Sequence, residues 1–311
     1  DSMYHDLFAD FDFPVPSSFD DKYDGRIAAS ENMMEIENHL NRRDMKQVAP
    51  PGLSRKDSLR WLSYGDKGQF WTPDDTLQGE ALKYWKYQTY IKDYLRCVAG
   101  VDRAIGRVLD YLEETGLSEN TLVVYTSDQG FYLGEHGWFD KRWIYEESLT
   151  TPCIVRWPGV TKPGATSDAI VSILDFPETF LEAAGQSVPS DMHGSSLGPL
   201  LAGQRPDDWR KSFYYHYYEF PGGHSVRKHY GVVTDRYKLF HFYEPDIDYW
   251  TLIDRKQDAQ ELKNVYDQPE HAKVQKELHG ELDRLRKELK VPAVDPPRRG
   301  RKKNQKSKQK S

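Results

Sequence analysis

The 311-residue sequence has few of the features that define special classes of protein. It has two cysteines, Cys97 and Cys153, which are too few for a disulfide framework and whose spacing fits no zinc motif. Both fall in apolar patterns, so we expect buried thiols. No run of about 18 apolar residues occurs, which excludes a transmembrane helix. The opening DSMYHDLFADF has neither the basic nor the apolar region of a signal peptide.

Charge is unevenly distributed along the chain. The net charge is -6, yet residues 296–311, PPRRGRKKNQKSKQKS, hold eight Lys and Arg residues and no acidic residue. An acidic body argues against nucleic acid as a partner of the whole chain. The basic tail is expected to be a disordered, solvated end. The alternative is a tail that contacts an anionic glycan, an anionic surface or nucleic acid.

Hydrophobic periodicity predicts an α/β body. Residues 1–79 are rich in Asp, Pro, Ser and Gly and read as irregular surface chain, with a helix near 32–40. From about Glu80 apolar residues recur at threes and fours, which predicts a long helix that ends at Gly116. The run 122–125 that follows is apolar on both faces, which favours a parallel strand inside an α/β sheet.

The second half predicts further strands and two helices. Residues 152–157 read as a strand, 169–173 as another strand or a short edge element, and a helix begins at Asp175 with Glu178 in a capping box. After about 203, the segments 229–235, 236–244 and 248–255 predict an antiparallel meander. An amphipathic helix is expected from Glu270 to Leu289.

Residues suited to binding an oxyanion follow the run 122–125. Asp128 stands where ligands bind in an open parallel sheet, beyond the carboxyl end of a strand. Its carboxylate and the amide oxygen of Gln129 suit Ca²⁺ or Mg²⁺, and Gly130 permits a close backbone approach. Lys141 adds a compact cation, and a metal ion with a lysine can receive a tetrahedral oxyanion. The alternatives are a turn residue at 128, a backbone cap at 129 and a surface charge at 141.

Three histidines are candidates for contact with the substrate. His136 stands between two glycines, and it could equally be a core or loop histidine. His216 and His224 lie in YYHYYEFPGGHSVRKHYG, 214–231, where aromatic faces and charged donors would suit an anionic ligand with apolar faces. The alternative for 214–231 is a loop that leads into a strand with packed tyrosines.

The order of residues in SDQGFYLGEHGWFDKRWIYEE, 127–147, resembles the second signature region of the sulfatase family, within the alkaline-phosphatase-like superfamily. The resemblance covers about 80–295 and is strongest to the bacterial branch related to N-acetylglucosamine-6-sulfatases and mucin-desulfating enzymes. It implies an alkaline-phosphatase-like α/β sheet between helices, incomplete here, and a smaller C-terminal antiparallel sheet with a helix. The implied divisions are a variable insert at 1–79, the C-terminal part of the catalytic domain at 80–202, the C-terminal subdomain at 203–295 and the tail at 296–311.

The resemblance also implies roles for residues. Asp128 matches a metal-binding aspartate, and Gln129 stands where many sulfatases have another metal ligand, with Ca²⁺ expected and Mg²⁺ as the alternative. Lys141 matches the lysine that contacts the sulfate and assists the leaving oxygen. Arg142, Tyr145 and Glu146 continue the motif as supporting residues. A sulfated glycan is the implied substrate, and the implied location is periplasmic or secreted.

One family feature does not occur in this sequence. Sulfatases use a formylglycine made from Cys or Ser in the motif C/S-x-P-x-R, and no segment of the chain has that pattern. By family order the motif precedes the residue numbered 1, so we expect the 311 residues alone to show no turnover. Two other functions compete: a phosphodiesterase or phosphonate hydrolase of the same superfamily, and a non-catalytic polyanion-binding protein that uses the tail.

Overall fold

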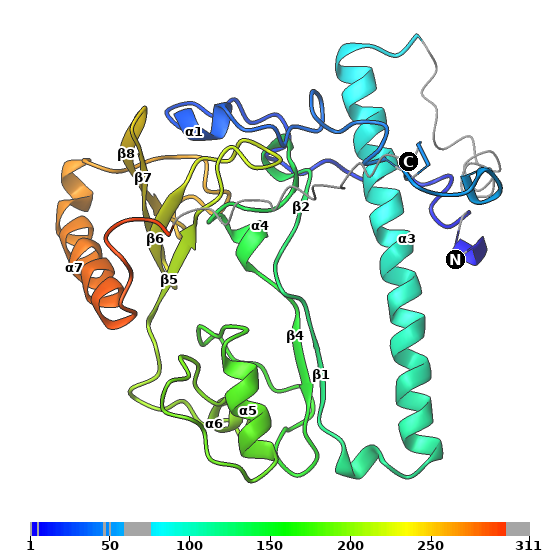
Figure 1. Cartoon of the computed structure of the whole chain (residues 1–311), viewed down its shortest axis with the longest axis vertical. Coiled ribbons are helices and arrows are strands. Elements are labelled where there is room, and N and C mark those ends of the chain that lie inside the picture. The colour runs from blue at the N-terminus through cyan, green and yellow to red at the C-terminus, as the bar shows by residue number, and fades with distance from the viewer. Residues whose placement is uncertain (1, 5, 46–47, 50, 59–75, 297–311) are drawn as a thin grey trace, which may run out of the picture.

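The computed structural model of the chain describes residues 2–4, 6–45, 48–49, 51–58 and 76–296 (Figure 1). Three units surround a central segment that contains residues 127–149. They are the N-terminal segment with a long helix, a pair of strands with two short helices, and a four-stranded sheet covered by a helix. Most of the basic tail, 297–311, lies outside the described residues, so the expectation of disorder there stays a prediction.

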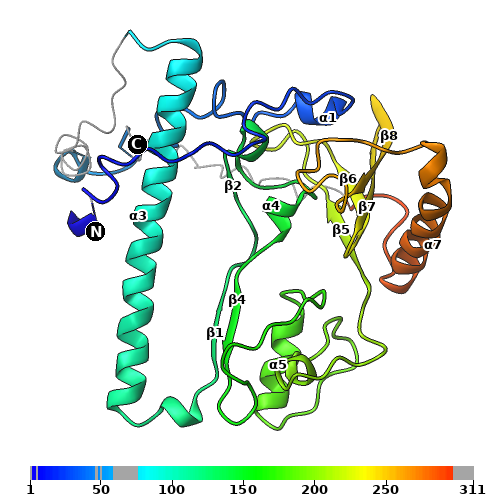
Figure 2. The ribbon, with the colours of Figure 1, turned by 180° about the vertical axis from the view of Figure 1, so that it is seen from behind.

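Helix α3, Gly79–Glu114, runs along one side of the molecule (Figures 1 and 2). It ends as expected, since Gly116 takes φ +71°, a conformation that glycine adopts without strain. Its first half packs on the N-terminal segment, where the Tyr87 hydroxyl donates to the Pro14 carbonyl at 2.7 Å. Within the described residues, no helix combines the length and the apolar character that crossing a membrane requires.

The strand that follows α3 differs from the expectation. Strand β1, Val123–Thr126, pairs antiparallel with β4, Cys153–Arg156, and within the described residues it has no parallel neighbour. The strands predicted at 122–125 and 152–157 exist, but no residue of β1 or β4 is buried, so apolarity on both faces indicated neither burial nor the partner strand. The thiols of Cys97 on α3 and Cys153 on β4 are free and exposed, so the prediction of buried thiols is wrong.

Two short helices complete the unit around β1 and β4. Residues 169–173 form no strand, because the Ile170 carbonyl accepts the Trp209 indole N–H at 2.9 Å. Helix α5, Asp175–Ala183, begins where expected, and α6 spans Gly198–Leu201. The expected capping box is wrong, since the Glu178 carboxylate accepts the backbone N–H of Gly194 instead.

The C-terminal meander is confirmed. Its strands are β5, Ser212–Tyr217; β6, His229–Thr234; β7, Tyr237–Glu244; and β8, Ile247–Asp254, hydrogen-bonded in that order and all antiparallel. Helix α7, Ala272–Glu288, covers one face (Figure 1) and buries Leu278, Leu282 and Leu285 against Val232, Leu239 and Leu252. The predicted closing helix is therefore confirmed as well.

The N-terminal segment is more buried than its composition indicates. It contains a 3₁₀ turn, Ser2–Tyr4, and α1, Ile27–Ser30, whereas the helix expected near 32–40 is a series of turns. Met34 and Ile36 are fully buried. Backbone hydrogen bonds join this segment to the centre, from Phe139 N–H to Met34 O at 2.9 Å and from Ile36 N–H to Gly137 O at 2.8 Å. The surface interpretation is wrong for this part of the chain, while the domain divisions stay predictions.

Candidate active site

The central segment consists of short elements joined by tight turns. Strand β2, Tyr132–Leu133, pairs with β3, Phe139–Asp140, around a 3₁₀ turn at Glu135–Gly137, and α4 spans Glu146–Leu149. Asp128 is exposed and Gln129 half-buried in the turn directly after β1. Both predicted metal ligands therefore lie on accessible chain at the end of a strand, as expected.

Gly130 fixes that turn against α4. Its N–H donates to the Ser148 carbonyl at 2.9 Å. A Cβ at this position would lie 2.0 Å from the carbonyl oxygen of Glu147, closer than real Cβ atoms approach. The glycine is thus needed for close backbone approach, which is the reason that the sequence analysis gave for it.

Lys141 follows β3 on an unusual stretch of backbone. Its neighbours Asp140 and Arg142 take φ +73° and +99°, conformations that residues with side chains rarely adopt. The Lys141 side chain is 36% exposed, and its Nζ lies 4.0 Å from Asp140 Oδ1. At that distance the ammonium group keeps its hydrogen-bond donors available to a ligand.

Two hydrogen bonds hold this backbone at Arg142. The Arg142 N–H donates to Ser148 Oγ at 3.0 Å, and the Tyr215 hydroxyl on β5 donates to the Arg142 carbonyl at 2.9 Å. The Ser148 carbonyl accepts the Gly130 N–H, and the Ser148 hydroxyl accepts the Arg142 N–H. One residue therefore joins the Asp128–Gln129 turn to the Lys141 turn. Sequence reasoning missed Ser148, because a serine that accepts two distant backbone N–H groups has no sequence signature.

His224 is the predicted sugar-contacting residue that lies beside Lys141. Its Nε2 lies 2.8 Å from Asp140 Oδ2, and its Nδ1 lies 3.0 Å from the Met33 carbonyl. The hydrogen bond to Asp140 raises the pKa of His224 above 6.5, against partial burial that lowers it. Burial raises the pKa of Asp140, but hydrogen bonds from His224 and Arg142 outweigh it, so the net shift is downward.

The other two predicted histidines lie elsewhere. His216 on β5 points to the sheet face opposite to that of Tyr215, where its ring nitrogens lie 2.9 Å and 2.8 Å from the hydroxyls of Tyr214 and Tyr243. Burial lowers the pKa of His216 to about 4, despite the nearby Asp295. His136 is fully buried in the aromatic core, as in the alternative of a core histidine.

The donors near Asp128 do not by themselves make a metal site. A carboxylate and an amide oxygen are chemically suited to Ca²⁺ or Mg²⁺, but Ca²⁺ takes about 6–8 oxygen ligands. Within the residues that the structure describes, no group of three or more His, Cys, Asp or Glu side chains is arranged to hold a metal ion. Asp128 and Gln129 supply only two ligating side chains, which is too few to hold a catalytic metal ion without further residues.

Comparison with known proteins defines the class. Residues 15–186 match the family model described as Sulfatase, and residues 134–288 match that described as N-sulphoglucosamine sulphohydrolase, C-terminal. The chain belongs to the sulfatase family. Its fold is the mixed α/β fold of sulfatase structures, in agreement with the fold class expected from the sequence.

Individual relatives indicate which members of the sulfatase family the chain resembles. The chain is 45% identical over 304 residues to an N-acetylglucosamine-6-O-sulfatase of Bacteroides thetaiotaomicron, covering 91% of this chain and 54% of that protein. A solved structure described as a complex with its substrate, D-glucosamine-2-N,6-O-disulfate, matches with TM-score 0.83 and 43% identity, over 93% of this chain and 62% of that chain. The chain thus spans little more than half the length of these relatives.

A less similar solved structure is that of an enzyme with a different activity. A phosphonate monoester hydrolase from Silicibacter pomeroyi matches with TM-score 0.60 and 30% identity, over 66% of this chain and 42% of that chain. Both the identity and the covered share are smaller than for the sulfatase of the preceding comparison.

Replacing Gly130 with alanine tests the link between the two turns. The added Cβ must displace the backbone at Glu147, so we expect Gly130→Ala to lower the free energy of unfolding by about 1–3 kcal/mol, as overpacking does. The measurement is urea denaturation followed by tryptophan fluorescence. Gly106→Ala on α3 is the control, because nothing lies within 4 Å of its added Cβ. It should be neutral or stabilising. A Gly130→Ala variant as stable as the wild type would contradict this geometry.

Proposed function

We propose that this chain provides the sulfate-binding lysine and a sugar-contacting histidine of a sulfuric ester hydrolase that acts on sulfated carbohydrates, with glucosamine 6-sulfate as the substrate class. The observation that carries the proposal is the position of Lys141. Its exposed ammonium group stands on a constrained turn, next to the Asp140 carboxylate that pairs with His224 at 2.8 Å. The relatives named above, with their glucosamine sulfate substrates, support this choice of sugar.

The two groups have separable tasks. The Lys141 ammonium binds the sulfate oxygens and lowers the energy of negative charge on the leaving sugar oxygen. His224 is anchored at Nδ1 by the Met33 carbonyl and presents Nε2 to Asp140. In this arrangement the imidazole and carboxylate form a rigid polar edge for sugar hydroxyls, and such hydrogen bonds distinguish one sugar from another.

We also propose the finer assignments made from the sequence. Asp128 and Gln129 contribute two oxygen ligands to a Ca²⁺ or Mg²⁺ site whose other ligands lie outside the described residues. The nucleophile is a formylglycine that this sequence does not encode. The location is periplasmic or secreted, as expected from the family.

Binding of a sulfated sugar tests the role of Lys141. We expect the chain to bind N-acetylglucosamine 6-sulfate and Lys141→Ala to bind it at least about tenfold more weakly, because a hydrogen bond to a charged group contributes about 1.5–3 kcal/mol. Saturation-transfer NMR and calorimetry measure this, with the exposed Lys162→Ala as the matched control. Equal binding of unsulfated N-acetylglucosamine, or an unaffected Lys141→Ala, would refute the assignment. Tighter binding of a methylphosphonate ester would favour the phosphonate hydrolase.

His224 should distinguish sugars from other sulfate esters. We expect His224→Ala to weaken binding of N-acetylglucosamine 6-sulfate several-fold and to leave 4-nitrophenyl sulfate unaffected, since the aryl group has no hydroxyls for the Asp140–His224 pair. Competition calorimetry with both ligands provides the ratio. Equal losses on both ligands would show that His224 supports the fold instead of contacting the sugar.

The absence of the C/S-x-P-x-R motif predicts a catalytically silent polypeptide. Incubation of the 311 residues with 4-nitrophenyl sulfate and Ca²⁺ should release no more 4-nitrophenol than a buffer blank, because the chain has no formylglycine to open a covalent route to S–O cleavage. Release at a rate proportional to protein concentration, and unaffected by Lys141→Ala, would mean that another group acts as nucleophile.

A further inference from the structure

Two histidines in the buried core of this protein have opposite electrostatic surroundings. His136 and His229 are both fully buried, and both belong to the aromatic cluster that includes Trp138, Trp143 and Tyr145. His229 has one polar neighbour, since its Nδ1 lies 2.8 Å from the Arg227 carbonyl. A neutral ring with its proton on Nδ1 can donate to this carbonyl, so no positive charge is required. Burial lowers the pKa of His229 to about 4.

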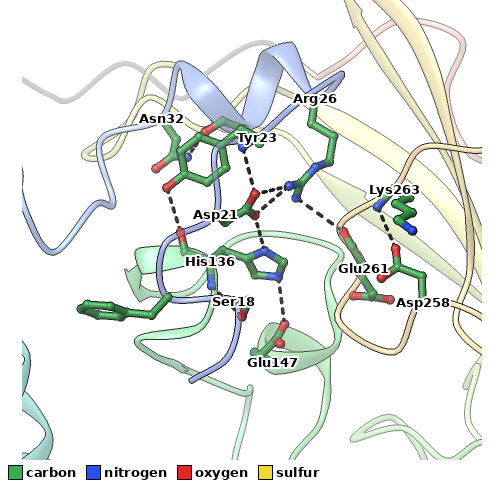
Figure 3. Close-up of polar contacts among 12 residues, drawn as sticks. Ser18, Asp21, Tyr23, Arg26, Asn32, His136, Glu147, Asp258, Glu261 and Lys263 are labelled. Carbon is green, nitrogen blue, oxygen red and sulfur yellow. Dashed lines mark hydrogen bonds and ion pairs between the residues drawn. The ribbon is translucent and has the colours of Figure 1, made fainter. Parts of the chain in front are cut away.

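His136 faces a carboxylate on each side of its ring (Figure 3). Nδ1 lies 2.9 Å from Asp21 Oδ2, and Nε2 lies 3.7 Å from Glu147 Oε2, an ion-pair separation. A carboxylate only accepts hydrogen bonds, and a neutral imidazole has one donor. Protons on both nitrogens, the imidazolium form, therefore suit both carboxylates, through a hydrogen bond at Nδ1 and an ion pair at Nε2.

The charged groups that lie beyond Asp21 and Glu147 also favour a protonated His136. On one side Arg26 forms two hydrogen bonds with Asp21, at 2.5 and 2.7 Å, and its other amino group reaches the Glu261 carbonyl at 3.5 Å. On the other side the fully buried Lys238 lies 2.6 Å from Glu261 Oε1 and 3.0 Å from Glu146 Oε2. Arg255 also pairs with Glu146, at 2.9 Å.

The balance of these eight charges depends on His136. The acids are Asp21, Glu146, Glu147 and Glu261, and the basic groups paired with them besides His136 are Arg26, Lys238 and Arg255. Both Glu261 oxygens face donors, the Lys238 ammonium and the Glu146 N–H at 2.7 Å, which fits a carboxylate even though burial raises its pKa. A protonated His136 makes four cations against four anions, whereas a neutral ring leaves an uncompensated negative charge, which is costly in a low-dielectric interior.

We propose that His136 is a positioning residue: a buried imidazolium that joins Asp21 of the N-terminal segment to Glu147 of α4 and so fixes the intervening turn that carries Lys141. The link is reinforced at the backbone, where the Tyr23 hydroxyl donates to the His136 carbonyl at 2.7 Å and the His136 N–H donates to Ser18 Oγ at 3.2 Å. Like Asp140 and Arg142 on the same loop, His136 has a left-handed backbone conformation, with φ +55°. This inference does not depend on the proposed sulfatase activity.

The sign of the pH dependence follows from the surroundings of the ring. Burial lowers the pKa of His136, but Asp21 and Glu147 raise it by more, and Asp21 is held at a pKa of about 2, where burial is outweighed by bonds from His136 and Arg26. The other titratable groups against the ring, Tyr132 and Tyr145, have pKa values raised by burial and stay neutral. The stabilisation from His136 is therefore complete below its unfolded pKa of about 6.5 and is lost as the pH rises through the folded pKa.

The experiment compares the pH dependence of stability in two matched variants of the 311-residue chain, His136→Gln and His229→Gln, by thermal unfolding from pH 5 to 9. The advantage of wild type over His136→Gln should be largest below pH 6.5 and shrink at alkaline pH. His229 stays neutral in the folded state, so the advantage of wild type over His229→Gln should instead shrink as the pH falls below 6.5. A difference from His136→Gln that is constant with pH, or that grows above neutrality, overturns the proposal.

A direct measurement covers the case in which His136→Gln does not fold. In wild-type protein labelled with ¹⁵N-histidine, both ring nitrogens of His136 should show imidazolium shifts at pH 7, and Asp21→Asn should move the titration to lower pH. Protection of the backbone amides of residues 134–149 from hydrogen exchange should fall through the same transition, with no such change at residues 229–254. A neutral ring at pH 7, or protection that does not follow the titration, refutes the role.

Discussion

Backbone held in left-handed conformations at residues with side chains is the constraint on which the central segment depends. Asp140 and Arg142 flank Lys141 in this way, and such conformations cost of order 1–3 kcal/mol each and persist only where the surrounding structure enforces them. The enforcing contacts come from three parts of the chain: Ser148 on α4, Tyr215 on β5 and the loop that presents His224. The lysine is therefore placed by the tertiary structure and not by its local sequence.

The N-terminal segment and the C-terminal sheet both pack against the central segment, residues 127–149. Both contribute hydrogen bonds, ion pairs and aromatic contacts to it, and the Met33 N–H donates to the His224 carbonyl at 2.7 Å. The C-terminal sheet thereby helps to hold the turn at Lys141 although none of its strands carries that residue. Loss of the N-terminal segment would remove the Asp21 carboxylate, and the cationic ring of His136 would then face Glu147 alone.

Sequence reasoning succeeded where a local pattern determines the structure. The 3.6-residue period of α3 and α7 and the turn-separated strands of the meander are such patterns. The roles that the family signature assigns to Asp128 and Lys141 stay predictions. Sequence reasoning failed where distant contacts decide. Apolarity of β1 did not reveal its antiparallel partner. The charged residues Asp21 and Arg26 suggested surface chain, whereas both are buried, paired with each other and with His136 and Glu261. Neither the role of Ser148 nor the left-handed residues beside Lys141 has a readable signal.

The two cysteines are solvent-accessible, unpaired, and placed on elements that neither carry Lys141 nor belong to the ionic cluster around His136. Cys97 lies on the long helix and Cys153 on the strand paired with β1. Native thiols at two such positions accept spectroscopic labels without any engineered substitution. A pair of spin labels or fluorophores there would report how α3 moves relative to the β1–β4 ribbon, while the central segment is left chemically untouched.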